Sequence, residues 1–192
     1  MRTYYPPDGA PEFELKVCEK VNFPARTLLH IFLIMLIGFL AYSNTFKDPF
    51  QWDDNYYIKE NPTVKDFSYF FDPSRAKGLD FYAALKSRYV GYLSFAVNYS
   101  IHGLDVTGYH VFNFIVHIMN ALLVYFFVVL IFRSPFLSGY PLKEQSGYIA
   151  FFTGLLFAVH PVQTEAVTYI FQRLASLSAF FYLCSIVCYM LW

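Results

Sequence analysis

Three groups of polar residues could do chemistry in this otherwise apolar sequence. The first is the adjacent pair Asp53 and Asp54, which follows Trp52. Two adjacent carboxylates can hold a divalent metal ion, or one can act as a general base while the other changes its pKa. The same Asp-Asp-Asn stretch is also typical of a turn or a helix N-cap, so the pair alone supports either interpretation.

The second group lies inside an apolar run and consists of His110, Asn113, His117 and Asn120. Spacings of three, four and three residues place all four on one face of an α-helix. Such a face is expected to point into a helix bundle and away from lipid. For Asn113, His117 and Asn120 we predict hydrogen bonds between helices, whereas His110 is equally suited to a site near the membrane surface.

The third group begins at His160 and Pro161 and continues to Glu165 and Arg173. Pro161 is expected to kink or restart a helix, because it has no backbone N–H to donate. Two interpretations of the charged residues remain open. Glu165 and Arg173 could form an ion pair that closes a hairpin, or Arg173 could donate hydrogen bonds to a phosphate or another anionic head group.

The composition indicates the surroundings in which these groups are held. Of the 192 residues, 57% are hydrophobic and only 15% are charged. A water-soluble domain normally has about a quarter of its residues charged, so we predict an integral membrane protein. Lys and Arg together number 14, as do Asp and Glu, and this balance gives no basic field for binding nucleic acid.

Crossing the hydrocarbon core of a bilayer takes about 20 mostly apolar residues. We therefore predict an all-α polytopic protein with about four transmembrane helices and a long first outer loop that carries interfacial helices. The expected spans are residues 27–46, 109–132, 147–170 and 174–192, with a cytoplasmic tail over 1–26 and the loop over 47–108. The strongest interfacial segment is 80–102, which carries Lys86 and Arg88.

Positive charges near the spans predict the orientation of the chain. Lys16, Lys20 and Arg26 precede the first span, and Arg133 and Lys143 lie between the second and third. This pattern indicates a cytoplasmic N-terminus. The titratable residues expected on the outer side are then Asp53, Asp54, Arg88, His102, His110, His160, Glu165 and Arg173. Their convergence on one membrane face suggests a site there.

Several short motifs, found in order between residues 42 and 173, resemble those of one protein family. They are Tyr42-Ser43-Asn44-Thr45-Phe46, Pro49-Phe50-Gln51-Trp52-Asp53-Asp54, Asn61-Pro62, Leu93-Ser94-Phe95, Asn98-Tyr99, Gly103-Leu104, Gly108-Tyr109-His110 with Asn113 and His117, and His160-Pro161-Val162-Gln163-Thr164-Glu165-Ala166-Val167 with Arg173. Together they resemble the transmembrane and tetratricopeptide-repeat-containing (TMTC-like) protein O-mannosyltransferases and their bacterial relatives. One departure is that the family commonly has Arg-Pro before Leu-Ser-Phe, whereas this sequence has Arg88-Tyr89 in that stretch.

The resemblance implies a GT-C architecture, in which the first outer loop of a helical bundle carries the catalytic carboxylate. It further implies an inverting transfer of a sugar, mannose in this family, from a polyprenyl-phosphate donor to a Ser or Thr hydroxyl of a translocated protein. The wording of the motifs is nearest the bacterial members, which implies a bacterial inner membrane with a periplasmic site. The alternative is an endoplasmic reticulum membrane with a luminal site.

The resemblance also assigns roles to the residues. One carboxylate of the pair, preferably Asp54, is expected to remove the proton of the acceptor hydroxyl. The residues expected to bind the donor phosphate or substrate are Arg88, His110, His160, Glu165 and Arg173. Glu165 would orient His160 or Arg173. A lipid-phosphate leaving group requires no metal ion. The alternative that Asp53 and Asp54 bind a divalent ion stays open.

The family normally continues into further spans and tetratricopeptide repeats, so the 192 residues are expected to be an amino-terminal portion. Its expected partners are the lipid-linked sugar, the protein acceptor, and either the remaining spans or a partner membrane subunit. The alternative function is a truncated, non-catalytic relative that serves as a scaffold in a larger membrane complex. A piece of a transporter is less favoured, because most polar groups lie toward one surface.

Overall fold

A computed structural model describes residues 25–134, 137 and 140–192, and every regular element in these ranges is helical. Two helices, α1 (Ala25–Tyr42) and α6 (Val106–Arg133), are long and apolar enough to cross a membrane. A third such segment, Ile170–Leu191, consists of the short turn η7 (Ile170–Gln172) and helix α9 (Arg173–Leu191). The prediction of an all-α membrane protein is therefore confirmed.

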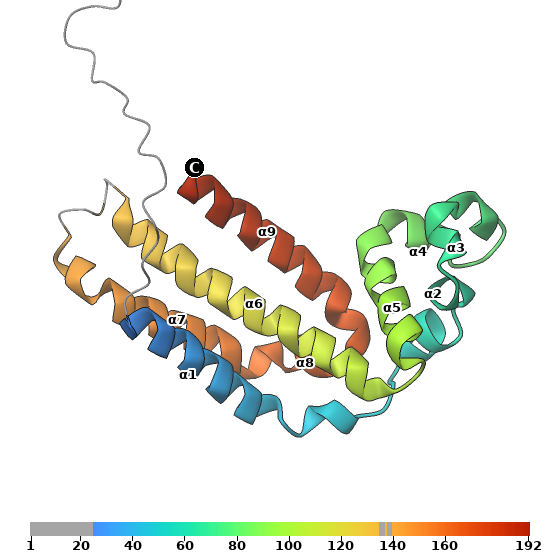
Figure 1. Cartoon of the computed structure of the whole chain (residues 1–192), viewed down its shortest axis with the longest axis horizontal. Helices are drawn as coiled ribbons and strands as arrows, with labels where there is room; N and C mark the ends of the chain where they lie inside the picture. The colour runs from blue at the N-terminus through green and yellow to red at the C-terminus, as the bar shows by residue number, and fades with distance from the viewer. Residues whose placement is uncertain (1–24, 135–136, 138–139) are drawn as a thin grey trace, which may run out of the picture.

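Helix α6 is the centre of the bundle (Figure 1). It packs against α9 on one side, and against α1 and α7 (Ser146–Val159) on the other. Helices α1 and α7 also contact each other. Helix α6 thus contacts α1, α7 and α9. These neighbours surround the middle of α6, where its polar residues lie.

The structure differs from the sequence prediction at the expected third span, residues 147–170. Helix α7, which is 14 residues long, begins at Ser146 and ends at Val159, well short of residue 170. A 3₁₀ turn, η6 (Pro161–Gln163), and a short helix, α8 (Thr164–Thr168), follow. The reason lies at Pro161, which cannot continue the hydrogen-bond ladder, while the side chain of His160 accepts the Val162 N–H and starts a new turn. The described residues thus contain three candidate spans and not four.

The polar face of α6 points into the bundle, as its spacing predicts. Asn113, His117 and Asn120 are all buried. His117 Nε2 lies 2.9 Å from the carbonyl oxygen of Ala158, and the Asn120 amide donates to the carbonyl of Ser176 at 3.0 Å. Each side chain therefore pairs with backbone at the end of another helix, which confirms the predicted hydrogen bonds between elements.

The long loop after α1 forms a small helical subdomain at the end of the bundle where α6 and α9 begin (Figure 1). Its helices are α2 (Pro62–Lys65), α3 (Ser68–Phe71), α4 (Tyr82–Ser87) and α5 (Tyr89–His102), joined by short turns. The expected interfacial segment 80–102 is thus two helices that are separated at Arg88. Asn61 caps α2 by accepting the Thr63 N–H at 2.9 Å, which explains why so short a helix begins there.

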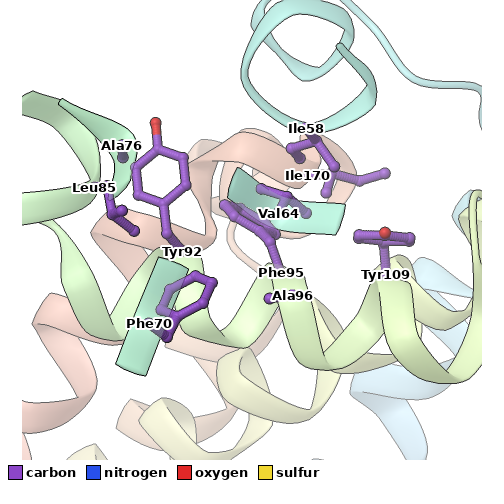
Figure 2. Packing of buried hydrophobic residues seen from close by; sticks show 10 residues of the cluster. All are labelled: Ile58, Val64, Phe70, Ala76, Leu85, Tyr92, Phe95, Ala96, Tyr109 and Ile170. Atoms are coloured by element: carbon purple, nitrogen blue, oxygen red, sulfur yellow. The ribbon is translucent and has the colours of Figure 1, made fainter. Parts of the chain in front are cut away.

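An aromatic-rich core holds this subdomain together, as Figure 2 shows. Tyr92 and Phe95 of α5 lie at its middle, beside Leu85 of α4. The same core includes Tyr109 from the start of α6 and Ile170 from η7. The subdomain therefore packs directly against the bundle. This packing fixes the position of Asp53 and Asp54.

The predicted tail, residues 1–26, falls almost wholly outside the described residues, and with it Lys16 and Lys20. The division into tail and membrane domain, and the cytoplasmic position of the N-terminus, stay predictions.

Candidate active site

The acid pair, Asp53 and Asp54, lies in a tight turn that follows Trp52. The Asp54 N–H donates to the carbonyl of Gln51 at 2.8 Å, and the Gln51 N–H donates back to the Asp54 carboxylate at 3.0 Å. This reciprocal pair of bonds closes the turn on itself. The two carboxylates, although adjacent in the sequence, have different surroundings as a result.

Asp54 is buried, with only 1% of its surface exposed. One carboxylate oxygen accepts the Gln51 N–H, and the other accepts the N–H of Phe171 at 2.7 Å. Burial raises the pKa of the Asp54 carboxyl above its usual range, while these N–H bonds and nearby His110 oppose that rise. Asp54 therefore attaches this turn of the loop after α1 to the segment at which the candidate span Ile170–Leu191 begins.

Asp53 has the opposite character, since it is exposed. Its backbone N–H donates to the hydroxyl of Tyr169 at 3.1 Å. That bond uses the backbone of Asp53, and the Asp53 carboxylate lies close to the same hydroxyl. This geometry favours Asp53, and not Asp54, as the carboxylate that a substrate can reach.

A cavity of about 690 Å³ opens beside Asp53, and residues from the start of α5 and from the first half of α9 line it. Its polar lining includes Asp53, Lys86, Arg88, Tyr169 and Gln172, and also Ser178 of α9. Helix α9 supplies an apolar wall through Leu174, Ala175, Leu177 and Phe181. Helix α9 is a candidate span, so this apolar wall belongs to a segment that is long and apolar enough to cross a membrane.

The structure brings two of the predicted site residues, Asp53 and Arg88, to this cavity. It also adds Lys86, Tyr169 and Gln172, which the sequence analysis did not single out as site residues. Lys86 could have been found from its place beside Arg88 in the expected interfacial segment. Tyr169 and Gln172 carry no such pattern, because only the packing of η7 against the loop places them at the cavity.

Arg173 has a different position from the one expected for a phosphate-binding residue. Its surface is fully buried, and its Nε donates to the Asn113 side-chain oxygen at 2.7 Å. The two Nη atoms donate to the side chain of Asn98 at 2.6 Å and to the carbonyl of Tyr109 at 3.0 Å. The guanidinium also lies over the rings of Phe95 and Phe112. The positive charge of Arg173 is therefore stabilised by hydrogen bonds to neutral oxygens and by cation–π contacts.

The predicted ion pair between Glu165 and Arg173 is not among the contacts of the described residues. Glu165 is exposed on α8, and His160 is an exposed cap of η6. Neither lines the cavity beside Asp53.

His110 is buried at the start of α6, where its Nε2 lies 2.9 Å from the carbonyl oxygen of Asp48. Because a carbonyl only accepts, Nε2 carries the proton. The bond ties the loop to α6 close to the acid pair, and His110 also stays outside the cavity lining.

The residues at the acid pair do not fit a metal site. The part of the chain that the structure describes contains no group of three or more His, Cys, Asp or Glu side chains that could hold an ion. Asp54 already accepts a backbone N–H on each oxygen. We therefore derive no step through a metal ion.

The fold and the cavity define an all-α membrane protein with an amphipathic cavity at one end of its helical bundle. The chain is 31% identical over 186 residues to protein O-mannosyl-transferase Tmtc3 of Drosophila melanogaster, an alignment that covers 88% of this chain and 20% of the fly protein. It is 31% identical to human protein O-mannosyl-transferase TMTC2 and 34% identical to that of Xenopus laevis, in each case over 80% of this chain and 18% of the relative. The chain belongs to this TMTC-like family.

The chain spans about a fifth of the length of these curated relatives. No protein-family model matches it, and no solved structure matches it.

Proposed function

We propose that this chain forms the outer-face part of a GT-C-type glycosyltransferase. The reaction is transfer of a sugar, by analogy with the names of the relatives a mannose, from a polyprenyl-phosphate donor to a Ser or Thr hydroxyl of a protein. The membrane is a bacterial inner membrane with the site toward the periplasm, or the endoplasmic reticulum membrane with the site toward the lumen.

The amphipathic cavity carries this proposal. A lipid-linked sugar has a charged phosphate at the membrane surface and an apolar chain below it. Lys86 and Arg88 supply positive charge to the cavity, and Leu177 and Phe181 belong to a candidate span. A cavity with both kinds of lining suits such a molecule better than it suits a soluble sugar nucleotide.

Asp53 is the base in this proposal. The acceptor oxygen forms a bond to C1 of the sugar while the bond from C1 to the phosphate oxygen breaks. The hydroxyl proton passes to the Asp53 carboxylate, and the lipid phosphate leaves with the bonding electron pair. A single displacement of this kind inverts the configuration at C1. Arg88 and Lys86 stabilise the charge that develops on the phosphate.

The test is a transfer assay with the purified protein, a mannosyl polyprenyl phosphate and a threonine-containing peptide. Asp53→Asn is expected to lower the rate at least about 100-fold, the usual contribution of a general base. Its thermal stability should match that of the wild type, because Asp53 is exposed. Asp80→Asn is the matched control, since Asp80 is an exposed carboxylate of the same loop that does not line the cavity.

Full activity of Asp53→Asn would overturn the assignment of Asp53. If the wild-type protein transfers no sugar and purifies in fixed ratio with a larger membrane complex, the alternative function, a non-catalytic scaffold subunit, replaces the proposal.

A further inference from the structure

Trp52 combines an unfavourable backbone with an exposed side chain. Its φ is 44°, and it is the one non-glycine residue with a positive φ in the described ranges. Bulky side chains rarely adopt this left-handed conformation, because Cβ crowds the backbone. The indole is 84% exposed, so packing within the chain does little to offset the strain.

The neighbours of Trp52 impose this conformation. Gln51 and Asp54 close the turn through their two reciprocal hydrogen bonds, and the Phe171 N–H fixes Asp54 from the far end of the chain. Trp52, the first of the two residues between them, is thereby held at a positive φ, which glycine would adopt without strain. Folding therefore gives no reason for an indole at this position, and residues held in strained conformations cluster at functional sites.

We propose that Trp52 is a contact for the acceptor polypeptide, which it holds beside Asp53. This inference rests on the proposed function. Trp52 immediately precedes Asp53 but is not among the residues that line the cavity for the lipid donor. It is thus open to a molecule that approaches the carboxylate from outside that cavity. Tryptophan suits such a contact, because one rigid side chain offers a large apolar surface and an N–H donor.

A membrane-surface position is the competing explanation, since tryptophan is also enriched where proteins meet lipid head groups. A lipid contact requires only the correct depth and is satisfied by a side chain on a relaxed backbone. The strained turn instead fixes the direction of the indole relative to Asp53. A fixed direction is useful to a ligand whose own position relative to that carboxylate matters.

Fluorescence can test the contact directly, because the sequence contains only two tryptophans. Trp192→Phe leaves Trp52 as the single indole of these 192 residues. A threonine-containing peptide without tryptophan should shift the emission to shorter wavelength and protect it from iodide. No response to the peptide, together with quenching by brominated phospholipids in nanodiscs, would overturn the proposal and assign Trp52 to the membrane surface.

Two substitutions at Trp52 separate the indole from the strain. Trp52→Ala removes the indole and keeps an unfavourable conformation, whereas Trp52→Gly removes both. We expect each to raise the KM for the peptide about tenfold with a smaller change in kcat, as for truncation of a binding hot spot. The glycine variant should also be at least as heat-stable as the alanine variant. Phe71→Ala, which removes an exposed aromatic elsewhere in the loop, should leave the KM unchanged.

The outcomes distinguish this inference from the proposed function. If the wild type transfers sugar and Trp52→Gly keeps its KM for the peptide, the contact is wrong and the transferase function stands. If the wild type neither transfers sugar nor responds to the peptide in fluorescence, both fail.

Discussion

At the scale of single residues, Tyr169 connects the acid pair to the cavity. Its hydroxyl accepts the Asp53 N–H, and its carbonyl oxygen lies 3.4 Å from the side-chain amide of Asn113. Burial raises the pKa of the Tyr169 phenol, so the hydroxyl keeps its proton at neutral pH. A phenol that accepts one hydrogen bond still has a proton to donate. Tyr169 thus fixes the backbone of Asp53 and keeps its own proton beside the Asp53 carboxylate.

Tyr169→Phe should therefore lower the transfer rate about tenfold through kcat, because the carboxylate is less well positioned while the ring still packs. The measurement is steady-state transfer to the peptide. Tyr92→Phe is a matched hydroxyl deletion in the aromatic-rich core of the subdomain after α1. The Tyr92 hydroxyl is buried and has no hydrogen-bond partner in the described structure, so its loss should leave transfer unchanged and stability equal or higher. Equal losses of activity in the two variants would contradict a specific role for Tyr169.

At the scale of elements, small residues decide how closely α7 approaches the bundle. Ala150, Gly154 and Ala158 lie four residues apart and are all buried. A Cβ added at Gly154 would lie 3.2 Å from the carbonyl oxygen of Ala121 in α6 and equally near Ile34 of α1. Spacing of small residues by four lets membrane helices pack at short range. This close contact lets a helix of only 14 residues bring the carbonyl of Ala158 to His117.

Gly154→Leu should separate α7 from α6 and destabilise the protein by about 2 kcal/mol, as overpacking of a tight interface does. Thermal unfolding in detergent would measure the loss. Phe152→Leu is the control, since it places the same side chain on the same helix at a position that is 63% exposed. Unchanged stability of Gly154→Leu would mean that α7 does not rely on this contact.

At the scale of the whole molecule, Arg173 joins the helical subdomain after α1 to the bundle. It begins α9, and its partners Asn98 and Asn113 belong to α5 and α6. Asn113 also donates to the carbonyl of Ile170 in η7, the turn whose Phe171 N–H donates to Asp54. A buried charge is stable only when its N–H donors are hydrogen-bonded. The guanidinium at the start of α9 therefore depends on the acceptors that α5 and α6 provide.

Arg173→Met is expected to destabilise the protein by about 3 kcal/mol, because it leaves several buried acceptors without a donor. Hydrogen exchange should increase most in α5 and in the turn of Gln51 to Asp54, which lose their link to α9. Arg75→Met, at an exposed arginine of the loop, should leave the exchange unchanged. Faster exchange confined to α9 would contradict the role of Arg173 as a link between the loop and the bundle.

The sequence by itself determined the features that depend on local pattern. Apolar length predicts α1, α6 and α9, and the three-and-four spacing along α6 predicts a polar face that points inward, because helical periodicity is local. Pro161 indicated a kink, although the sequence did not show that α7 would end before it at Val159. The resemblance to the family likewise rests on motifs that are visible in the chain alone.

Only the tertiary structure decided which carboxylate faces the cavity and what Arg173 contacts. Asp54 is buried because the Phe171 N–H reaches it across 117 positions of sequence, and Asp53 is exposed as a consequence. Arg173 is enclosed because α5, α6 and α9 converge on it. Such contacts join segments that carry no common pattern, so side-chain chemistry at each position could indicate what was present but not which groups would meet.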